Sequence, residues 1–169
     1  DPSISSSLQA NLSSGFNGGA VYDRGHQLPS ADRICDAATN RTTFYYSNMT
    51  PQIGKKLNQT IWASLEDKVR GWVSGTDTLF VVTGAMPPTS GTIERQKGMA
   101  VPAYYFKALA RQVNKTFYTI AFKMDNKQYT GTDYMSTAIS VEELEQLTGF
   151  TFFPTLDAQA KKLDKSKWQ

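Results

Sequence analysis

The chain has 169 residues, of which 40% are hydrophobic and 12% aromatic, and its formal net charge is +3. This composition is typical of one globular domain with a real core, and it excludes a disordered or low-complexity chain. The longest apolar run, residues 79–86, is far shorter than the roughly 18 residues that a membrane span requires, so we expect no membrane partner.

Basic residues are concentrated in the middle of the chain. Residues 51–130 hold eleven Lys or Arg against five Asp or Glu, whereas residues 1–50 hold three against four and residues 131–169 four against six. Such an excess suits a surface that binds a polyanion, but scattered solvated lysines would give the same count. Because Cys35 and His26 are the sole cysteine and histidine, the usual zinc ligand sets are excluded, and any metal should be a hard, oxygen-preferring one.

The first third of the chain predicts two short strands. Residues 1–18, rich in Ser, Gly and Asn, are expected to form an irregular lead-in. Residues 19–25 predict a strand that breaks at Gly25, residues 33–44 a polar connection, and residues 43–49 a second, aromatic strand.

A long amphipathic helix follows over residues 55–73. Apolar residues recur there every four positions, and two tryptophans widen the apolar stripe. The repeated positions are Leu57, Ile61, Leu65, Val69 and Val73, and the tryptophans are Trp62 and Trp72. This period predicts a helix of four or five turns with one buried face.

The next segments predict mainly extended structure. Residues 77–84 predict a buried strand that ends in glycine, and residues 87–98 predict a loop. Residues 101–111 and 115–125 predict two strands joined by a turn at Asn114.

A second helix is predicted over residues 140–149. Ser140 and Glu143 form a capping-box pattern at its start, and Gly149 marks its end. The tail, residues 158–169, is expected to be polar and helical or frayed. Because strands and helices mix without regular strand–helix–strand alternation, the fold class is expected to be α+β.

His26 lies in the stretch VYDRGHQLPSADR, residues 21–33. Gly25 permits a tight turn beside it, and the charge of Arg24 is expected to lower the histidine pKa, which would keep the ring neutral and able to take a proton from water. An arginine can also hold a phosphate in a bidentate fork. The pair therefore suits attack on a phosphodiester, although a histidine that only satisfies a loop hydrogen bond is the simpler alternative.

Asn58 and Glu66 lie on one face of the predicted long helix. Eight residues separate them by about 12 Å along the axis, so they cannot easily bind one ion directly together. Asn58 could hold a metal while Glu66 acts through water. Alternatively, Asn58 caps the helix and Glu66 pairs with Arg70 at i,i+4 spacing.

Three motifs in this order, DRGHQLPSADR, YYSNMTPQ and LNQTIWASLEDKVR, resemble the DNA/RNA non-specific endonuclease family. That family carries a ββα-metal motif with a DRGH signature, and the resemblance runs from about Val21 to Gly149. It implies an α+β ββα-metal nuclease fold, with a mainly antiparallel sheet flanked by helices. It also implies that residues 1–169 form a single nuclease domain.

The resemblance implies a role for each residue of the site. His26 corresponds to the general base that activates water, and Asn58 to the sole direct protein ligand of a Mg²⁺ ion, which Mn²⁺ or Ca²⁺ could replace. Glu66 corresponds to a helix glutamate that acts on this site without binding the ion directly. Arg24 and Arg70 correspond to the family's catalytic arginines near the scissile phosphate.

The remaining implications concern substrate and partners. Asn48 and Gln52 correspond to polar residues that bind substrate or support the site, and Asp23 to an anchor for the motif. The implied substrates are DNA and RNA, cut to 5′-phosphate products. Homodimerisation and an inhibitor protein as partner are left open by the sequence.

The chain begins 22 residues before Asp23, without Met and without a signal-peptide pattern. Family members usually have an upstream strand pair with a further arginine, so we expect that segment to be missing. This leaves a catalytically impaired nucleic-acid-binding module as the alternative function, and a phosphodiesterase for small substrates as a third possible function.

We expect a secreted or periplasmic bacterial protein whose leader has been removed.

Overall fold

The computed structural model describes residues 1–16, 21–73 and 78–168. Its strands are β1 (Tyr22–His26), β2 (Met49–Ile53), β3 (Leu79–Met86), β4 (Arg95–Gln96), β5 (Met99–Ala100), β6 (Tyr104–Val113), β7 (Thr116–Asp125) and β8 (Ala138–Ile139). Its main helices are α1 (Ala37–Thr42), η4 (Gly54–Trp62), α2 (Ala63–Gly71) and α3 (Val141–Thr148). Short 3-10 turns are η1 (Ser6–Leu8), η2 (Ser30–Asp32), η3 (Tyr46–Asn48), η5 (Tyr134–Thr137) and η6 (Lys165–Trp168).

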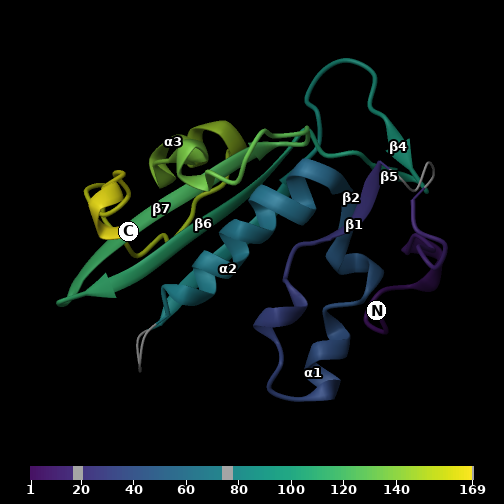
Figure 1. The fold of residues 1–169 in the computed structure, drawn as a ribbon, viewed down its shortest axis with the longest axis horizontal. Coiled ribbons are helices and arrows are strands. Elements are labelled where there is room, and N and C mark those ends of the chain that lie inside the picture. The colour runs from purple at the N-terminus through teal and green to yellow at the C-terminus, as the bar shows by residue number, and fades with distance from the viewer. Residues whose placement is uncertain (17–20, 74–77, 169) are drawn as a thin grey trace.

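The main sheet is antiparallel with strand order β3–β6–β7–β8, and β1 and β2 form a separate antiparallel pair. In Figure 1 the long β6–β7 hairpin lies between α2 and α3, and the β1–β2 pair lies near the start of the long helix. The predicted α+β class, with a mainly antiparallel sheet flanked by helices, is confirmed. No helix in the described ranges combines the length and the apolar character that crossing a membrane would need.

The β6–β7 hairpin confirms the predicted pair of strands and their turn. Asn114 and Lys115 both have left-handed backbone angles, with φ of 50° and 66°, and Val113 pairs with Thr116. Two successive left-handed residues give a tight two-residue turn whose twist matches that of the strands. Asparagine adopts this conformation more readily than most residues do.

Side chains of β6 alternate between two cores. Tyr105 and Leu109 pack with the residues of η4 and α2, whereas Phe106 and Ala108 pack with those of α3. This alternation follows from the two-residue period of a strand that is covered on both faces. The long helix and the third helix therefore lie on opposite faces of one hairpin, as Figure 1 shows.

The predicted long helix is confirmed as η4 followed directly by α2. Its regular part begins after Lys56, whose φ of 66° is not helical, and the carbonyl oxygen of Lys56 accepts a hydrogen bond from the Tyr129 amide. Four of the five periodic residues are buried, namely Leu57, Ile61, Leu65 and Val69, and both tryptophans are buried with them. Val73 is 49% exposed because it follows the last helical turn.

Both strand predictions in the first third of the chain need correction. The first strand does not break at Gly25 but continues to His26, because Gly25 pairs with Thr50 of β2. Residues 43–49 contain the turn η3, and the second strand is β2, which includes Pro51. Pairing with β1 outweighs the aromatic character that favoured the earlier segment.

The predicted polar connection over residues 33–44 contains α1. Asp36 caps this helix, because its carboxylate accepts a hydrogen bond from the Thr39 amide at 2.9 Å.

Parts of three predicted segments lie outside the described residues. These are residues 17–20, which belong to the predicted lead-in and first strand, and Asp77, which belongs to the strand predicted over residues 77–84.

Strand β3 is more exposed than its apolar sequence predicts. Phe80, Val81 and Val82 are between 38% and 48% exposed, because β3 is an edge strand that pairs only with β6 among the described strands. The predicted loop over residues 87–98 also contains β4, which pairs with β5.

The second predicted helix is confirmed as α3. The Ser140 hydroxyl accepts a hydrogen bond from the Glu143 amide at 3.0 Å, and Gly149 ends the helix with a φ of 73°. The tail, predicted to be helical or frayed, ends its described part in the 3-10 turn η6, which packs against the core. Trp168 is 1% exposed and packs edge-on against Trp72, with ring centroids 5.1 Å apart.

We expect Trp168→Ala to lower the free energy of unfolding by about 3–5 kcal/mol, because it leaves a cavity beside Trp72 and removes a buried aromatic surface. Leu8→Ala serves as the control, since Leu8 is 80% exposed, and its effect should stay within about 0.5 kcal/mol. Urea unfolding followed by fluorescence and by circular dichroism measures both. Equal stability of the two variants would contradict the docking of the tail.

Candidate active site

Five of the residues singled out from the sequence surround one part of the molecule. His26 and Asn58 both line a cavity of about 790 Å³ together with Arg24, and both also line a second cavity of about 250 Å³. Glu66 and Arg70 line this second cavity. The imidazole and the side-chain amide therefore converge from β1 and from the first turn of the long helix.

Asp23 fixes the position of Asn58. Its Oδ2 accepts hydrogen bonds from the side-chain amides of Asn58 and Gln59, both at 2.8 Å. Because the amide nitrogen of Asn58 is used in this way, its carbonyl oxygen remains as the group that can bind a cation. Gly54 permits the contact, since a Cβ there would lie 2.7 Å from Oδ1 of Asp23.

His26 has a free ring nitrogen in a half-buried position. Its ring packs edge-on against Phe44 at a centroid distance of 5.3 Å, and its Nε2 is buried without a hydrogen-bond partner in the described part of the chain. Burial lowers the pKa of His26, a hydrogen bond to the Arg24 backbone raises it, and the Arg24 guanidinium lowers it. The net pKa is below the ordinary value. The lowering was predicted from the Arg24 charge, but burial is the larger cause.

Glu66 is mostly buried and faces a lysine rather than Arg70. Lys107 Nζ lies 3.8 Å from Glu66 Oε1. Burial raises the pKa of Glu66, and the positive charge of Lys107 opposes this rise. Among the described residues, no ion pair joins Glu66 to Arg70.

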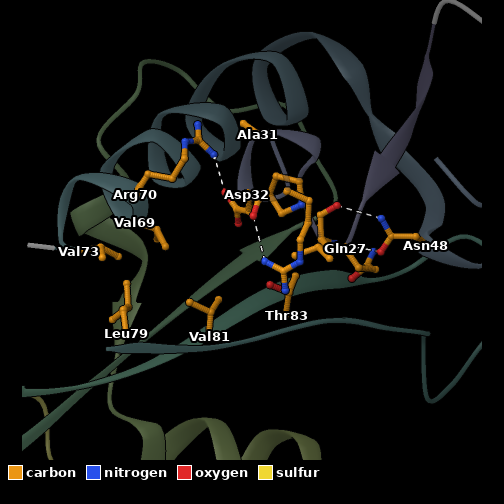
Figure 2. Close-up of a pocket in the computed structure, with 13 residues that line it drawn as sticks. Gln27, Ala31, Asp32, Asn48, Val69, Arg70, Val73, Leu79, Val81 and Thr83 are labelled. Carbon is orange, nitrogen blue, oxygen red and sulfur yellow. Dashed lines mark hydrogen bonds and ion pairs between the residues drawn. The ribbon is translucent and has the colours of Figure 1, made fainter. Parts of the chain in front are cut away.

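Arg70 is held by two aspartates instead. It donates a hydrogen bond to Asp32 at 3.0 Å and forms a second ion pair with Asp67, three residues earlier on the same helix. Figure 2 shows the Asp32 carboxylate facing the Arg70 guanidinium across the pocket. Asp32 therefore connects the loop after His26 to α2.

Asn48 and Gln52 have surroundings that favour a supporting role. The Asn48 side chain accepts from the Leu28 amide and donates to the carbonyl oxygens of Leu28 and Thr43, so both ends of its amide are engaged. Gln52 is completely buried, and a Cβ on Gly25 would lie 2.4 Å from its Oε1. Direct binding of substrate by these two residues stays a prediction.

A third cavity, of about 580 Å³, adjoins the site between the loop after His26, α2 and β3 (Figure 2). It shares three residues with the small cavity, namely Pro29, Ala31 and Arg70. One side of it is apolar and is lined by Val69, Val73, Leu79 and Val81. The charged groups of the site thus lie next to a partly apolar surface.

The residues of the site fit a hydrated hard cation better than a fully protein-bound metal. The described residues contain no group of three or more His, Cys, Asp or Glu side chains that could hold a metal ion. What they offer as a direct ligand is the amide oxygen of Asn58, while the Glu66 carboxylate lines the same cavity from about two turns further along the helix. A donor set of this kind suits Mg²⁺, which keeps most of its waters and accepts few protein oxygens.

Sequence reasoning missed Lys107, Phe44 and the Asp32–Arg70 pair. Lys107 comes from the middle of β6, far along the chain from the motifs, and no spacing connects it to Glu66. Asp32 lies within the quoted histidine stretch, so its charge was visible there, but its partner could not be.

Comparison with known proteins gives one family and several related nucleases. The sequence matches the family described as DNA/RNA non-specific endonuclease over residues 1–159. It is 30% identical to Nuclease C1 of Cunninghamella echinulata var. echinulata over 168 residues, which is 93% of this chain and 66% of that protein. It is 28% identical to the mitochondrial nuclease of Saccharomyces cerevisiae over 181 residues, which is 96% of this chain and 54% of that protein.

The fold is similar to a solved chain from the structure described as the EndoG/EndoGI complex, mechanism of EndoG inhibition. The TM-score is 0.81 at 23% sequence identity, and the match covers 95% of this chain and 69% of that one. The chain thus spans between about half and two thirds of the length of the two related nucleases.

We expect Gly54→Ala to lower the free energy of unfolding by about 1–3 kcal/mol, because the new methyl group would displace the Asp23 carboxylate from Asn58 and Gln59. Gly71→Ala is the matched control, since a Cβ there meets nothing within 4 Å, and it should be neutral or stabilising by up to about 1 kcal/mol. Chemical denaturation measures both. The close packing of Gly54 on Asp23 is refuted if the two variants are equally stable.

Proposed function

The chain belongs to the DNA/RNA non-specific endonuclease family, and from this premise we propose that it is a nuclease that hydrolyses phosphodiester bonds of DNA and RNA. The observation that carries the proposal is the convergence of His26 and Asn58 on the same two cavities, with Arg24 at one and Arg70 at the other. These are the groups that hydrolysis of a phosphodiester requires: a base, a site for a cation and positive charges for the phosphate.

His26 is the proposed general base. His26 lines both cavities, and its buried Nε2 has no competing hydrogen-bond partner within the described chain, so we propose that this nitrogen accepts a proton from an attacking water. The lowered pKa keeps the ring neutral at pH 7, which is the form that can accept this proton. The edge contact with Phe44 restricts the ring, so that the nitrogen keeps its direction.

The two arginines are proposed to bind the phosphate. Arg24 lines one and Arg70 the other of the two cavities that His26 and Asn58 share, and a guanidinium can donate two parallel hydrogen bonds to phosphate oxygens. Asp32 keeps Arg70 in place while the substrate enters. Both guanidinium groups would then stabilise the negative charge that grows on the phosphate during attack.

Asn58 is proposed to hold Mg²⁺ through its amide oxygen, and Mn²⁺ or Ca²⁺ could take its place. When bound, the cation would supply a positive charge that stabilises the reacting phosphate and the leaving oxygen. Asp23 holds Asn58 in a fixed orientation for this purpose. The Glu66 carboxylate adds negative charge to the same cavity.

Lack of sequence specificity is proposed to follow from contacts with the backbone of the nucleic acid. Residues 51–130 carry eleven basic against five acidic residues, and phosphate contacts carry no base information. The products would carry a 5′-phosphate and a 3′-hydroxyl. A catalytically impaired binding module is the less well supported alternative, because the relatives are named nucleases and the proposed base has a free nitrogen.

Partners and location remain predictions. A chain of similar fold is described in a complex and with a mechanism of inhibition, so an inhibitor protein stays among the proposed partners, and so does a second copy of the chain. One relative is named as mitochondrial, which indicates that location varies among related nucleases. Secretion or a periplasmic location is therefore a proposal that the relatives do not decide.

Digestion of plasmid DNA and of RNA tests the function. We expect both to be cut with Mg²⁺ and neither to be cut with EDTA, and we expect His26→Ala and Asn58→Ala to lose at least about 100-fold in rate. Gln112→Ala, an exposed amide at the far end of β6, should cut like the wild type. Cutting that persists in EDTA, or in His26→Ala at the wild-type rate, would exclude the proposed mechanism.

The pH dependence of kcat/KM tests the role of His26. A base must be neutral, so activity falls as the pH drops through the histidine pKa, and burial places that pKa below its ordinary value of about 6.5. The acid limb should therefore lie below about 6.5. Phe44→Ala exposes the ring to water and should move this limb upward. A wild-type limb above the ordinary histidine value would contradict the assignment.

A further inference from the structure

The helix-facing side of β6 carries a buried ammonium group in an otherwise apolar row. Lys107 is 1% exposed, and its neighbours on the same face, Tyr105 and Leu109, are completely buried core residues. Lysine is almost never fully buried unless it is paired, because moving its charge out of water is unfavourable, and an apolar residue of similar size would often stabilise the fold more. Its presence therefore indicates a use other than stability.

Three contacts define where the charge of Lys107 acts. Nζ donates a hydrogen bond to the Thr83 hydroxyl of β3 at 2.9 Å and lies 4.8 Å from the ring centroid of Trp62. Its remaining partner is Oε1 of Glu66, at 3.8 Å. Figure 2 shows Thr83 on the strand that lines the cavity next to the site. The ammonium is thus held from the sheet and the indole while it faces the carboxylate.

We propose that Lys107 is a positioning residue that fixes the Glu66 carboxylate, from inside the sheet, toward the cavity that Glu66 shares with His26 and Asn58. The inference rests on the proposed nuclease function, because it assigns to Glu66 an effect on that reaction. Lys107 does not line this cavity and therefore acts through Glu66.

The charges around Glu66 make Lys107 the main group that favours the carboxylate anion. Asp32 opposes the anion, and Arg70 favours it less strongly because its charge is shared with two aspartates. His26 lines the same cavity from β1 and is neutral at pH 7. Burial raises the pKa of Glu66 and lowers the pKa of Lys107, and in each case the charge of the other residue is the largest of the groups that act against the change, so the two charges support each other. Without the Lys107 charge, the buried carboxyl group would hold its proton to a higher pH.

A second buried lysine provides a matched control. Lys161, 9% exposed, pairs at 2.7 Å with Glu145, which also accepts a hydrogen bond from the Phe152 amide. None of these residues lines the cavities around His26. Loss of Lys161 therefore removes a comparable buried ion pair on the α3 side, and any effect that both lysines share is an effect on folding.

The test compares Lys107→Met, Lys107→Arg and Lys161→Met with the wild type, below the melting temperature of each variant. In Mg²⁺-dependent DNA cleavage we expect Lys107→Met to lose at least about tenfold in kcat with little change in KM, which is the pattern of a lost transition-state effect. Lys107→Arg, which keeps the charge, should recover most of the rate. Lys161→Met should keep the wild-type kcat.

A carboxyl ¹³C NMR titration of Glu66 tests the same contact without any activity. Loss of an opposite charge at this distance should raise the titration midpoint of Glu66 by about one pH unit or more in Lys107→Met, and not in Lys161→Met. Should Lys107→Met not fold, Thr83→Val frees the ammonium from β3 and should change kcat and the midpoint in the same direction by less.

A double-mutant cycle with Glu66→Gln decides whether Lys107 acts through Glu66. We expect Lys107→Met to have less than about a twofold effect on kcat in the Glu66→Gln background. An equal loss in both backgrounds, or an unchanged Glu66 midpoint, overturns the proposal. A wild-type chain that does not cut nucleic acid refutes the proposed function instead, and the titration then still decides whether Lys107 controls the Glu66 carboxylate.

Discussion

The hydrogen bonds of the Asp23 carboxylate connect the two halves of the site. Asp23 belongs to β1, which also carries His26, and it holds the side chains of Asn58 and Gln59 in the first turn of the long helix. A single carboxylate therefore decides where the amide of Asn58 lies relative to the imidazole. The Gly54 backbone packs directly against this carboxylate, with no space for a side chain between them. The distance between the helix and the strand can therefore vary little.

The β1–β2 pair is itself fastened to the main sheet. The Tyr105 hydroxyl donates to the Pro51 carbonyl oxygen at 3.0 Å, and the Asn126 side chain accepts from the Ile53 amide at 2.8 Å while donating to Pro51. These contacts tie β2 to β6 and to the end of β7. The hairpin that carries α2 on one face thus also supports, through β2, the strand pair that carries His26, so the same sheet positions both.

Burial has opposite consequences for the two ionisable groups of the site. It lowers the pKa of His26 and raises that of Glu66, since in each case the uncharged form is favoured away from water. A neutral imidazole is what the proposed base requires, whereas a neutral carboxyl group would be of little use beside the proposed cation. The buried charge of Lys107 counteracts the effect of burial on Glu66 alone, because it lies on the sheet side of the helix.

The sequence by itself determined the elements whose signals are local. The four-residue period of the long helix, the turn at Asn114 and the cap at Ser140 are all present, because short-range geometry alone produces them. The order of the motifs also identified His26 and Asn58 as the residues to examine, although their chemical roles are still proposals. Contacts between distant segments decided the rest. Strand pairing placed the second strand at β2 rather than at residues 43–49, and an edge position left β3 exposed. Only the packing of β6 under α2 brings Lys107 to Glu66. The sequence around a charged residue in a strand does not indicate which distant residue it will contact.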